Sequence, residues 1–462
     1  MAGTLIVGAG SAGCVLAARL SADPARTVRV LEAGPVWPAL SAMPAALRDP
    51  AHLPVGPDSE VVWRYPGNLV RGRLAGGSGA INGSYFLRPP AADFVAWSAA
   101  AGRRWSFDAV LPVFRGLEND LDFGAGPDHG DSGPVPVSRT ADPAPVSVAF
   151  AARCAAAGFT ELTDLNAGSG AAEGFGRVPL TISGGRRAGP AVTHLYPAAA
   201  RPNLTVTGET TVTRLLWRGT RVVGVEWTRG AERGTSRADQ VVLCAGAVES
   251  AALLLRSGIG PEAQLRALGI PVVRPAPVGA WCTDHPEIGI EYPGEPGRPA
   301  VALEYVLELA DLELRPYTPQ FTAGLRRLGV ALMHPVAAGE LTLRAPEASV
   351  PPHIDQGYLR RSPDRAALRD GVDIAAQILG RRLGPVDEAW LRAHLSTSQH
   401  LSGTCRMGAA TDERAVVDEY GRVHGIDGLV VADLSIVPVP LRRGPQAAVM
   451  ILAAAIADYM VV

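Results

Sequence analysis

The sequence predicts an α/β protein in which a Rossmann-like dinucleotide-binding domain is joined to a second, discontinuous domain built on an antiparallel sheet. The first indication is a strand–helix–strand pattern between Thr4 and Gly34, with a glycine-rich turn at its first junction. The second is a nearly all-apolar run, Gln240 to Gly246, which leads into another helix and should return to the same sheet. The stretches 91–189 and 286–391 carry weaker patterns, and we assign them to the second domain.

The opening stretch has the order that a dinucleotide-binding unit requires. An apolar run, Thr4–Val7, enters a G-x-G-x-x-G turn made by Gly8, Gly10 and Gly13, and a helical pattern follows. Gly8 allows the tight turn, Gly10 lets a pyrophosphate approach the backbone, and Gly13 lets the helix pack on the strand. The helix N-terminus offers free N–H groups to phosphates. Glu32 ends the next strand about 20 residues later, where a carboxylate accepts from ribose hydroxyls.

This unit alone leaves two questions open. Glycine-rich turns are common, so the same residues could form a plain strand–turn–helix with glycines that serve packing. The unit also does not distinguish FAD from NAD. The rest of the chain must decide both points.

A second glycine-rich stretch runs from Arg71 to Gly83. So many glycines cannot form a stable helix interior, so the stretch predicts a loop whose backbone amides contact a flat or phosphorylated ligand. Asn82 adds a side-chain amide that both donates and accepts hydrogen bonds. A flexible surface loop is the alternative, but the apolar neighbours Leu74, Ala80 and Ile81 argue against it.

Further along the chain, the periodicity predicts helices over Ala91–Leu117 and Val146–Ala157. Alternating runs between Asn203 and Trp227 predict antiparallel strands. A final helix should begin near Gln446, and because it is apolar nearly all round, it should be buried.

Composition excludes several classes of function. A formal net charge of -2 over 462 residues argues against a nucleic-acid partner, which needs a clustered basic surface. The chain has no lysine, which excludes a Walker-type phosphate lysine and a lysine Schiff base. The five cysteines form no C-x-x-C pair, so we expect reduced thiols, a cytoplasmic protein and no metal site. Asp458 interrupts the apolar tail, so we expect no transmembrane segment.

Taken together, these stretches resemble the glucose–methanol–choline (GMC) oxidoreductases, which are FAD enzymes. Six motifs occur in the family's order. They are the first βαβ unit, the glycine-rich flavin loop at Arg71–Asn82, the second signature from Gly246–Ser250 through Ser257–Pro261, the Asp284-His285-Pro286 mark, the active-site histidine loop at His400–Gly408, and the flavin-contacting strand end at Asp433–Pro438.

The resemblance implies a cofactor site and a domain organisation. FAD should be bound without a covalent link, because Ile81 stands where some members carry a flavin-bonding histidine. The FAD-binding domain should comprise residues 1–90, 190–285 and 401–462, and the substrate domain residues 91–189 and 286–400. The residues implied to bind FAD are Gly8, Gly10, Ser11, Ala12, Gly13, Glu32, Ala33, Arg73, Leu74, Gly76, Gly77, Ser78, Asn82, Gly83, Val212, Ala245, Gly246, Asp433 and Ala447.

The implied chemistry is oxidation of CH–OH to C=O by hydride transfer to flavin N5. His400 would accept the hydroxyl proton, since neutral imidazole can take a proton near neutral pH. Gln446 aligns with the family's second active-site residue, a His or Asn, and would orient the substrate oxygen without acting as a base. His285 is expected to be structural.

Within the family, Leu117–Phe123 and Ser78–Phe86 resemble the mycofactocin-associated branch. The resemblance implies a mycofactocinol dehydrogenase that passes electrons to an organic or respiratory acceptor, in the cytoplasm or at the inner face of the membrane. The alternatives are a small-alcohol oxidase or choline-type dehydrogenase, a non-redox FAD-containing hydroxynitrile lyase, and an electron-relay partner of a membrane complex.

Overall fold

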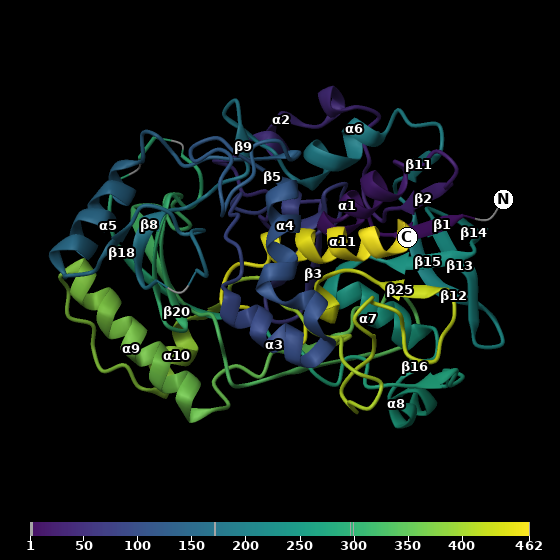
Figure 1. Cartoon of the computed structure of the whole chain (residues 1–462). Coiled ribbons are helices and arrows are strands. Elements are labelled where there is room, and N and C mark those ends of the chain that lie inside the picture. The colour runs from purple at the N-terminus through teal and green to yellow at the C-terminus, as the bar shows by residue number, and fades with distance from the viewer. Residues whose placement is uncertain (1–2, 171, 296, 299, 462) are drawn as a thin grey trace.

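Two sheets with separate hydrophobic cores organise the computed structural model (Figure 1). The structure describes residues 3–170, 172–295, 297–298 and 300–461. The five-stranded sheet and its helices lie on the right of Figure 1, where both chain ends are found, and the seven-stranded sheet lies on the left. The α/β class expected from the sequence is confirmed by this arrangement.

The five-stranded sheet is parallel throughout and holds the expected βαβ unit. Its strand order is β11 (Leu204–Thr207), β2 (Val28–Leu31), β1 (Thr4–Val7), β15 (Gln240–Leu243) and β25 (Leu429–Val431). Thr4 pairs with both Val28 and Gln240, so the second strand–glycine–helix junction does return to the first sheet.

Helices α1 (Ser11–Leu20), α7 (Gly246–Arg256) and α11 (Gln446–Val461) share the hydrophobic core of this sheet. The final helix is buried as expected, because every residue from Ala447 to Ala454 is inaccessible to solvent or nearly so. Helix α11 packs against α1, and the two helices run side by side in Figure 1.

The seven-stranded sheet is antiparallel except at one edge. Its order is β24 (Leu395–Thr397), β18 (Pro286–Pro293), β21 (Leu325–Leu332), β20 (Leu312–Tyr317), β19 (Tyr305–Leu309), β8 (Gly174–Arg177) and β7 (Glu161–Leu162). Helices α5 (Pro145–Ala156), α9 (Ser362–Leu379) and α10 (Glu388–His394) accompany it, and α5 and α9 bury Phe150, Leu368 and Val372 in its core.

Two of the predicted elements were wrong in detail. Asn203–Thr213 is not one antiparallel strand, because a turn at Gly208-Glu209 separates β11 from β12, and Glu209 adopts φ of 52°. Only β12 (Thr211–Arg218), β13 (Arg221–Arg229) and β14 (Glu232–Arg237) form an antiparallel sheet. The helical stretch 91–117 breaks at Gly102, whose φ of 85° ends α3 (Ala91–Ala101) before α4 (Phe107–Leu117) begins.

Short elements complete the chain. The helices are α2 (Ala45–Arg48), α6 (Tyr196–Ala198), α8 (Glu262–Ala267) and the single turns Leu40–Ala42, Gly77–Ala80, Arg103–Trp105, Ala191–Leu195 and Leu434–Ile436. The strand pairs are β3 (Val62–Tyr65) with β4 (Leu69–Gly72), β5 (Glu118–Asp120) with β6 (Val135–Val137), β9 (Ile182–Ser183) with β10 (Arg186–Arg187), β16 (Ile259–Gly260) with β17 (Arg274–Pro275), and β22 (Glu340–Thr342) with β23 (His353–Asp355).

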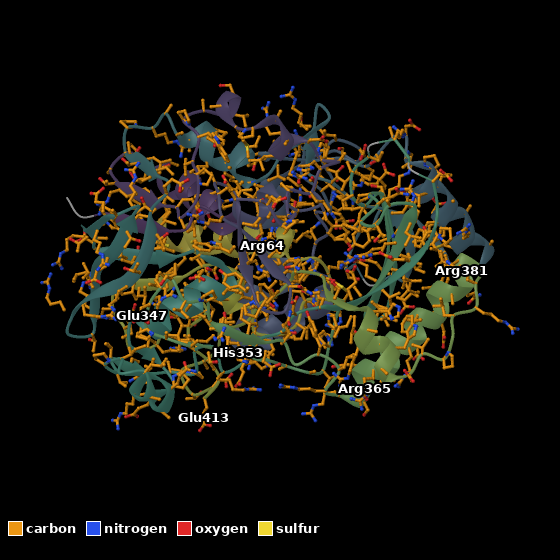
Figure 2. All side chains as sticks on the ribbon, turned by 180° about the vertical axis from the view of Figure 1, so that it is seen from behind. Arg64, Glu347, His353, Arg365, Arg381 and Glu413 are labelled. Carbon is orange, nitrogen blue, oxygen red and sulfur yellow. The ribbon has the colours of Figure 1, made fainter. Side chains whose placement is uncertain are left out.

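The surface carries both signs of charge. On the face seen in Figure 2, the labelled Arg64, Arg365 and Arg381 share the surface with Glu347 and Glu413. Within the described ranges, no helix combines the length and apolar character needed to cross a bilayer.

Candidate active site

A cavity lies where β1, β2 and β15 of the parallel sheet end. It has about 1200 Å³ of atom-free space, counting the part open to solvent. Thirteen of the residues expected at a cofactor or catalytic site line it. They are Gly8, Gly10, Ser11, Ala12, Glu32, Ala33, Gly77, Ser78, Val212, Ala245, Gly246, Asp433 and Gln446.

The two glycine-rich stretches meet at this cavity. A Cβ atom on Gly77 would lie 2.7 Å from the Cα of Gly10, and Gly77 has φ of +53°. Gly8 adopts φ of +95°, a conformation that L side chains rarely take. The backbone of both stretches is therefore exposed to the cavity without intervening side chains, as binding of a pyrophosphate through amides requires.

Glu32 lies in the cavity wall and braces the first glycine turn. Its carboxylate accepts hydrogen bonds from the backbone N–H of Ala9 at 2.7 Å and of Gly34 at 2.9 Å. Burial raises the pKa of Glu32 to about 7, and these hydrogen bonds and the positive charge of Arg73 only partly oppose the rise. The ribose-binding role expected for Glu32 remains compatible with this position.

Asp433, which also lines the cavity, holds two segments of its wall together. Its Oδ2 accepts from the backbone N–H of Gly246 at 2.8 Å and from the Ser250 hydroxyl at 2.5 Å. Its Oδ1 accepts from the backbone N–H of Ser435 at 2.9 Å. One buried carboxylate thus ties the start of α7 to the segment that follows β25.

Other residues expected at the site lie around the cavity without forming its lining. A Cβ on Gly13 would lie 2.0 Å from the Gly8 carbonyl oxygen, so Gly13 serves helix–strand packing. Leu74 is fully buried in a small apolar cluster, and Arg73 lies over the Trp63 ring. Gly76, Asn82, Gly83 and Ala447 complete this set.

One wall of the cavity was not predicted from the sequence, although Arg71 and Glu249 lie in stretches expected near the cofactor. The β3–β4 hairpin contributes Trp63, Tyr65 and Arg71, and α7 contributes Glu249 and Arg256. The Tyr65 hydroxyl donates to Glu249 at 2.8 Å, and Arg256 pairs with Glu249 at 2.8 Å. Alternating residues on either side of the Gly67-Asn68 turn carried a hairpin signal, but nothing in the sequence indicated what the hairpin covers.

His400 is held by contacts to both its backbone and its ring. The Asp284 carboxylate accepts the backbone N–H groups of His400 at 2.7 Å and of His285 at 2.9 Å. The Nδ1 atoms of the two imidazoles lie 2.8 Å apart, and the rings meet edge to face at 85°. His285, expected to be structural, is therefore in direct contact with the candidate base.

The side chain of Gln446 is hydrogen-bonded to the two glycine-rich stretches and, among the described residues, not to His400. Its Oε1 accepts from the Ser11 hydroxyl at 3.1 Å and from the Asn82 side-chain amide at 3.5 Å. The position beside His400 is Gly444, where an added Cβ would lie 3.9 Å from Cε1 of His400. The same Cβ would lie 3.0 Å from the Tyr85 ring, so Tyr85 and His400 flank Gly444.

Comparison with known proteins agrees with this geometry. Two profiles, both described as GMC oxidoreductase, match residues 2–287 and 335–453. The chain belongs to the GMC oxidoreductase family. It is 41% identical, over 97% of its own length and 96% of the relative's, to "Uncharacterized GMC-type oxidoreductase in thcA 5'region" of Rhodococcus erythropolis. It is 34% identical to an oxygen-dependent choline dehydrogenase of Burkholderia cenocepacia, over 98% and 92% of the two chains.

Solved structures extend the comparison. Pyridoxine 4-oxidase from Mesorbium loti superposes with a TM-score of 0.91 at 31% identity and 99% coverage of both chains. Formate oxidase superposes with a TM-score of 0.89 over 99% of this chain and 97% of the other. At 22% identity the second likeness shows the fold alone.

This GMC oxidoreductase is an FAD enzyme, and its cavity fits that cofactor. The exposed backbone at Gly10 and Gly77 suits a pyrophosphate, and the Glu32 carboxylate in the cavity wall would be available to ribose hydroxyls. The polar side chains of Ser11 and Gln446 also line the cavity, as do Gln399 and Leu401 on either side of His400. The residues that line the cavity therefore fit FAD.

Electrostatics keep both histidines of this GMC oxidoreductase neutral. Burial lowers the pKa of His285 to about 4, and the positive charge of Arg315 adds to this effect. Burial also lowers the pKa of His400 well below its ordinary value, reinforced by His285, Arg315 and Arg71. A neutral imidazole has a free lone pair, which a proton acceptor requires.

A buried charged network connects Tyr85 with the loop that carries His400. The Tyr85 hydroxyl donates to Glu313 at 2.5 Å, and Arg315 pairs with both Glu313 and Glu287. Arg315 also donates to the Ser398 hydroxyl at 2.8 Å, close to the loop that carries His400. Tyr85 is thus fixed by a buried ion-pair chain on the same side as the candidate base.

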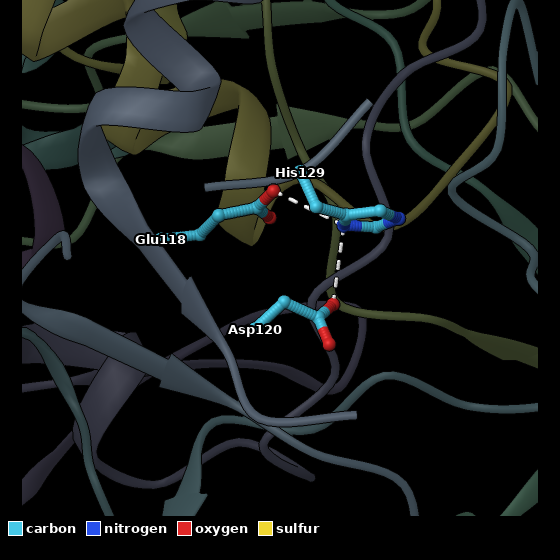
Figure 3. A group of neighbouring side chains, drawn as sticks. All are labelled: Glu118, Asp120 and His129. Atoms are coloured by element: carbon cyan, nitrogen blue, oxygen red, sulfur yellow. Dashed lines mark hydrogen bonds and ion pairs between the residues drawn. The ribbon is translucent and has the colours of Figure 1, made fainter. Parts of the chain in front are cut away.

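A second cluster of titratable groups lies away from the cavity, on the loop after α4 (Figure 3). Nδ1 of His129 lies 3.2 Å from carboxylate oxygens of both Glu118 and Asp120. Its Nε2 lies 2.8 Å from Asp164. By distance alone, Glu118, Asp120 and His129 could share a metal ion.

The charges explain this cluster without a metal. Arg139 pairs with Asp120 at 2.5 Å and with Asp164 at 3.0 Å, and Arg88 lies 3.7 Å from Glu118. Burial opposes a charge on His129, but hydrogen bonds to Asp120, Asp164 and Glu118 outweigh it and raise its pKa to about 10. Three carboxylates are therefore balanced by two guanidinium groups and one imidazolium. We interpret the cluster as an ion-pair network that stabilises the fold.

Proposed function

We propose that this chain oxidises a CH–OH group of a small alcohol to C=O, with His400 accepting the hydroxyl proton. The observation that carries the proposal is a neutral imidazole, fixed by Asp284 and His285, on a loop whose neighbouring residues Gln399 and Leu401 line the FAD cavity. General-base catalysis by a positioned imidazole contributes about 10²–10⁴ in rate.

The bound FAD supplies a two-electron acceptor for the hydride that leaves the alcohol carbon. The residues of the chain do the rest. His400 takes the hydroxyl proton, and the neighbouring positive charges of Arg315 and Arg71 favour its neutral form before the reaction. Tyr85, beside Gly444, limits the space in which the alcohol can lie. A fixed alcohol near a fixed base avoids much of the entropic cost of a bimolecular reaction.

We assign Gln446 to the cofactor side of the site. Its amide oxygen is engaged by Ser11 and Asn82, which sit in the two glycine-rich stretches. From there it orients the flavin ring, and through the ring the substrate oxygen. We also propose that FAD is held without a covalent bond, because Ile81 is a buried aliphatic residue with no nucleophilic atom.

For the substrate we propose mycofactocinol, on the resemblance of 117–123 and 78–86 to the mycofactocin-associated branch. Electrons would then pass towards respiration, in the cytoplasm or at the inner face of the membrane. Choline and pyridoxine are the comparison substrates, since relatives carry their names. We expect two partners, a small-molecule alcohol that is oxidised and an organic or respiratory electron acceptor.

The test is anaerobic flavin reduction in purified holoenzyme with reduced mycofactocin, choline, pyridoxine and benzyl alcohol as separate donors. We expect one donor to bleach the flavin, and His400→Ala to slow bleaching by about 10²–10⁴. His353→Ala is the matched control, because His353 is exposed on the surface (Figure 2). An unchanged rate in His400→Ala removes His400 from the mechanism.

Two further outcomes separate the alternatives. Rapid reoxidation by air with peroxide formation indicates an oxidase. Cleavage of a cyanohydrin while the flavin stays oxidised indicates a lyase and overturns the proposal.

A further inference from the structure

The hydrogen bond between His285 and His400 joins two neutral rings. Their Nδ1 atoms are 2.8 Å apart, and His285 is only 2% exposed. A neutral imidazole has one N–H and one lone pair, so this contact is a hydrogen bond only if one Nδ1 donates and the other accepts. The pair therefore has two tautomeric arrangements, and they differ in what His400 can do.

Asp284 does not decide between the two arrangements. Its Oδ1 accepts the backbone N–H groups of both histidines, and its Oδ2 accepts the Thr397 hydroxyl at 2.7 Å. This carboxylate is therefore occupied by the backbone and a hydroxyl group. Among the described residues, the Asp284 carboxylate makes no hydrogen bond to either imidazole ring. His285 is therefore the group that orients the ring of His400.

In the first arrangement, His285 donates from Nδ1, so His400 must carry its proton on Nε2. That tautomer has no lone pair left for a substrate hydroxyl. In the second arrangement, His400 donates from Nδ1 to the Nδ1 lone pair of His285, and Nε2 of His400 is free to accept a proton. Only the second arrangement leaves His400 competent as a base.

The role of His400 as the base selects the second arrangement. Burial favours the neutral form of both imidazoles, so neither ring donates from both of its nitrogens. A His400 that takes a hydroxyl proton on Nε2 carries its own proton on Nδ1, where Nδ1 of His285 lies 2.8 Å away. Arg315, Glu313 and Arg71 are the other charged groups that act on the two rings from neighbouring elements.

We propose that His285 is a positioning residue which accepts the Nδ1 proton of His400 and so keeps Nε2 of His400 as the proton acceptor. The proposal rests on the proposed function, in which His400 is the base. When the hydroxyl O–H bond breaks, its electron pair stays on oxygen and the proton forms a new bond to Nε2. His400 then carries two N–H groups, and its Nδ1–H remains bonded to the lone pair of His285, which disperses the positive charge.

The first test reads the tautomer directly and needs no substrate. Holoenzyme labelled with ¹⁵N-histidine is recorded by long-range ¹H–¹⁵N correlation, and the His400 signals are assigned from their loss in His400→Asn. We expect Nδ1 of His400 to be protonated and Nε2 bare. A proton on Nε2 of His400 in the resting holoenzyme overturns the proposal.

The second test uses variants of His285 in anaerobic flavin reduction, with whichever of reduced mycofactocin, choline, pyridoxine and benzyl alcohol reduces the flavin of the wild-type holoenzyme. His285→Ala removes the acceptor, and we expect reduction to slow about 10- to 100-fold with KM changed less than about threefold. His285→Asn offers an amide oxygen in place of Nδ1, and we expect at least about tenfold recovery over His285→Ala. Equal rates for His285→Asn and His285→Ala overturn the proposal.

The outcomes separate this proposal from the proposed function. If His400→Ala keeps the wild-type rate, the assignment of the base fails and this inference falls with it. If His400→Ala is slow while His285→Ala is as fast as wild type, the base stands and only the inference fails. Should His285→Ala not fold, the tautomer measurement on the unsubstituted holoenzyme still decides.

Discussion

A Cβ atom on Gly77 would lie 2.7 Å from the Cα of Gly10. The two glycine turns therefore touch through their backbones at the wall of the FAD cavity. Gly77 also has φ of +53°, where a side chain is strained. Contact and strain together make this position sensitive to a single added methyl group.

We expect Gly77→Ala to weaken FAD binding by at least about tenfold, equivalent to ~1.4 kcal/mol, because the turn must shift to relieve the contact. Titration of apoprotein with FAD, followed by flavin fluorescence, measures the effect. Gly56→Ala is the control, because a Cβ there meets no atom within 4 Å and should leave affinity unchanged. Wild-type affinity in Gly77→Ala would contradict the packing described.

Glu32→Gln tests the carboxylate in the cavity. Burial raises the pKa of Glu32 to about 7 in the apoprotein, so the carboxylate becomes ionised between about pH 6 and 8. If ribose hydroxyls donate to the ionised form, FAD affinity should rise over this window. Hydrogen bonds to a charged group contribute about 1.5–3 kcal/mol, so Glu32→Gln should bind FAD roughly 10- to 100-fold more weakly at pH 8. The affinity of Glu32→Gln for FAD should also no longer depend on pH. Isothermal titration calorimetry at several pH values measures both the weaker binding and the lost pH dependence.

Gln446→Ala separates the cofactor side of the site from proton transfer. Its amide is hydrogen-bonded to Ser11 and Asn82 and, among the described residues, not to His400, so we expect weaker FAD binding, about 3- to 10-fold, from the lost neutral hydrogen bonds. Flavin reduction at saturating FAD should fall far less than in His400→Ala. A loss in Gln446→Ala equal to that in His400→Ala would give the glutamine a direct part in the chemistry.

His129→Gln tests the ion-pair network of Figure 3. The folded-state pKa of His129 is raised to about 10, above an unfolded value of about 6.5. The imidazolium therefore stabilises the fold fully below pH 6.5, and this stabilisation is lost as pH rises through 10. Breaking a buried charge network costs roughly 3–5 kcal/mol, so the variant should be less stable than wild type by this amount at pH 6.

The difference in free energy of unfolding between wild type and His129→Gln should shrink as pH rises from 7 towards 10. Urea denaturation at fixed pH values measures this difference. His353→Gln, on the exposed surface, should show no such dependence. A difference that stays constant with pH would mean that His129 is neutral in the folded protein. Added divalent metal should not restore stability to the variant.

The sequence determined the elements whose conformation is fixed by neighbouring residues. The βαβ unit could be read from Thr4 to Gly34, because a tight turn, a close backbone approach and a helix–strand contact each demand glycine locally. The buried final helix could be read from its composition, since a helix with no polar face must lie inside. Of the strands between Asn203 and Trp227, the β12–β13 pair was predicted, but the sheet that β11 joins was not.

Only the tertiary structure decided how distant side chains meet. His285 and His400 are 115 residues apart, and their contact depends on where the loop after β24 crosses the start of β18. The same packing sets Gly444 beside His400 and turns Gln446 towards Ser11. The Tyr65–Glu249 bond and the His129 network arise in the same way. Backbone conformation is governed by local sterics, whereas these contacts depend on the docking of whole elements, which no short pattern encodes.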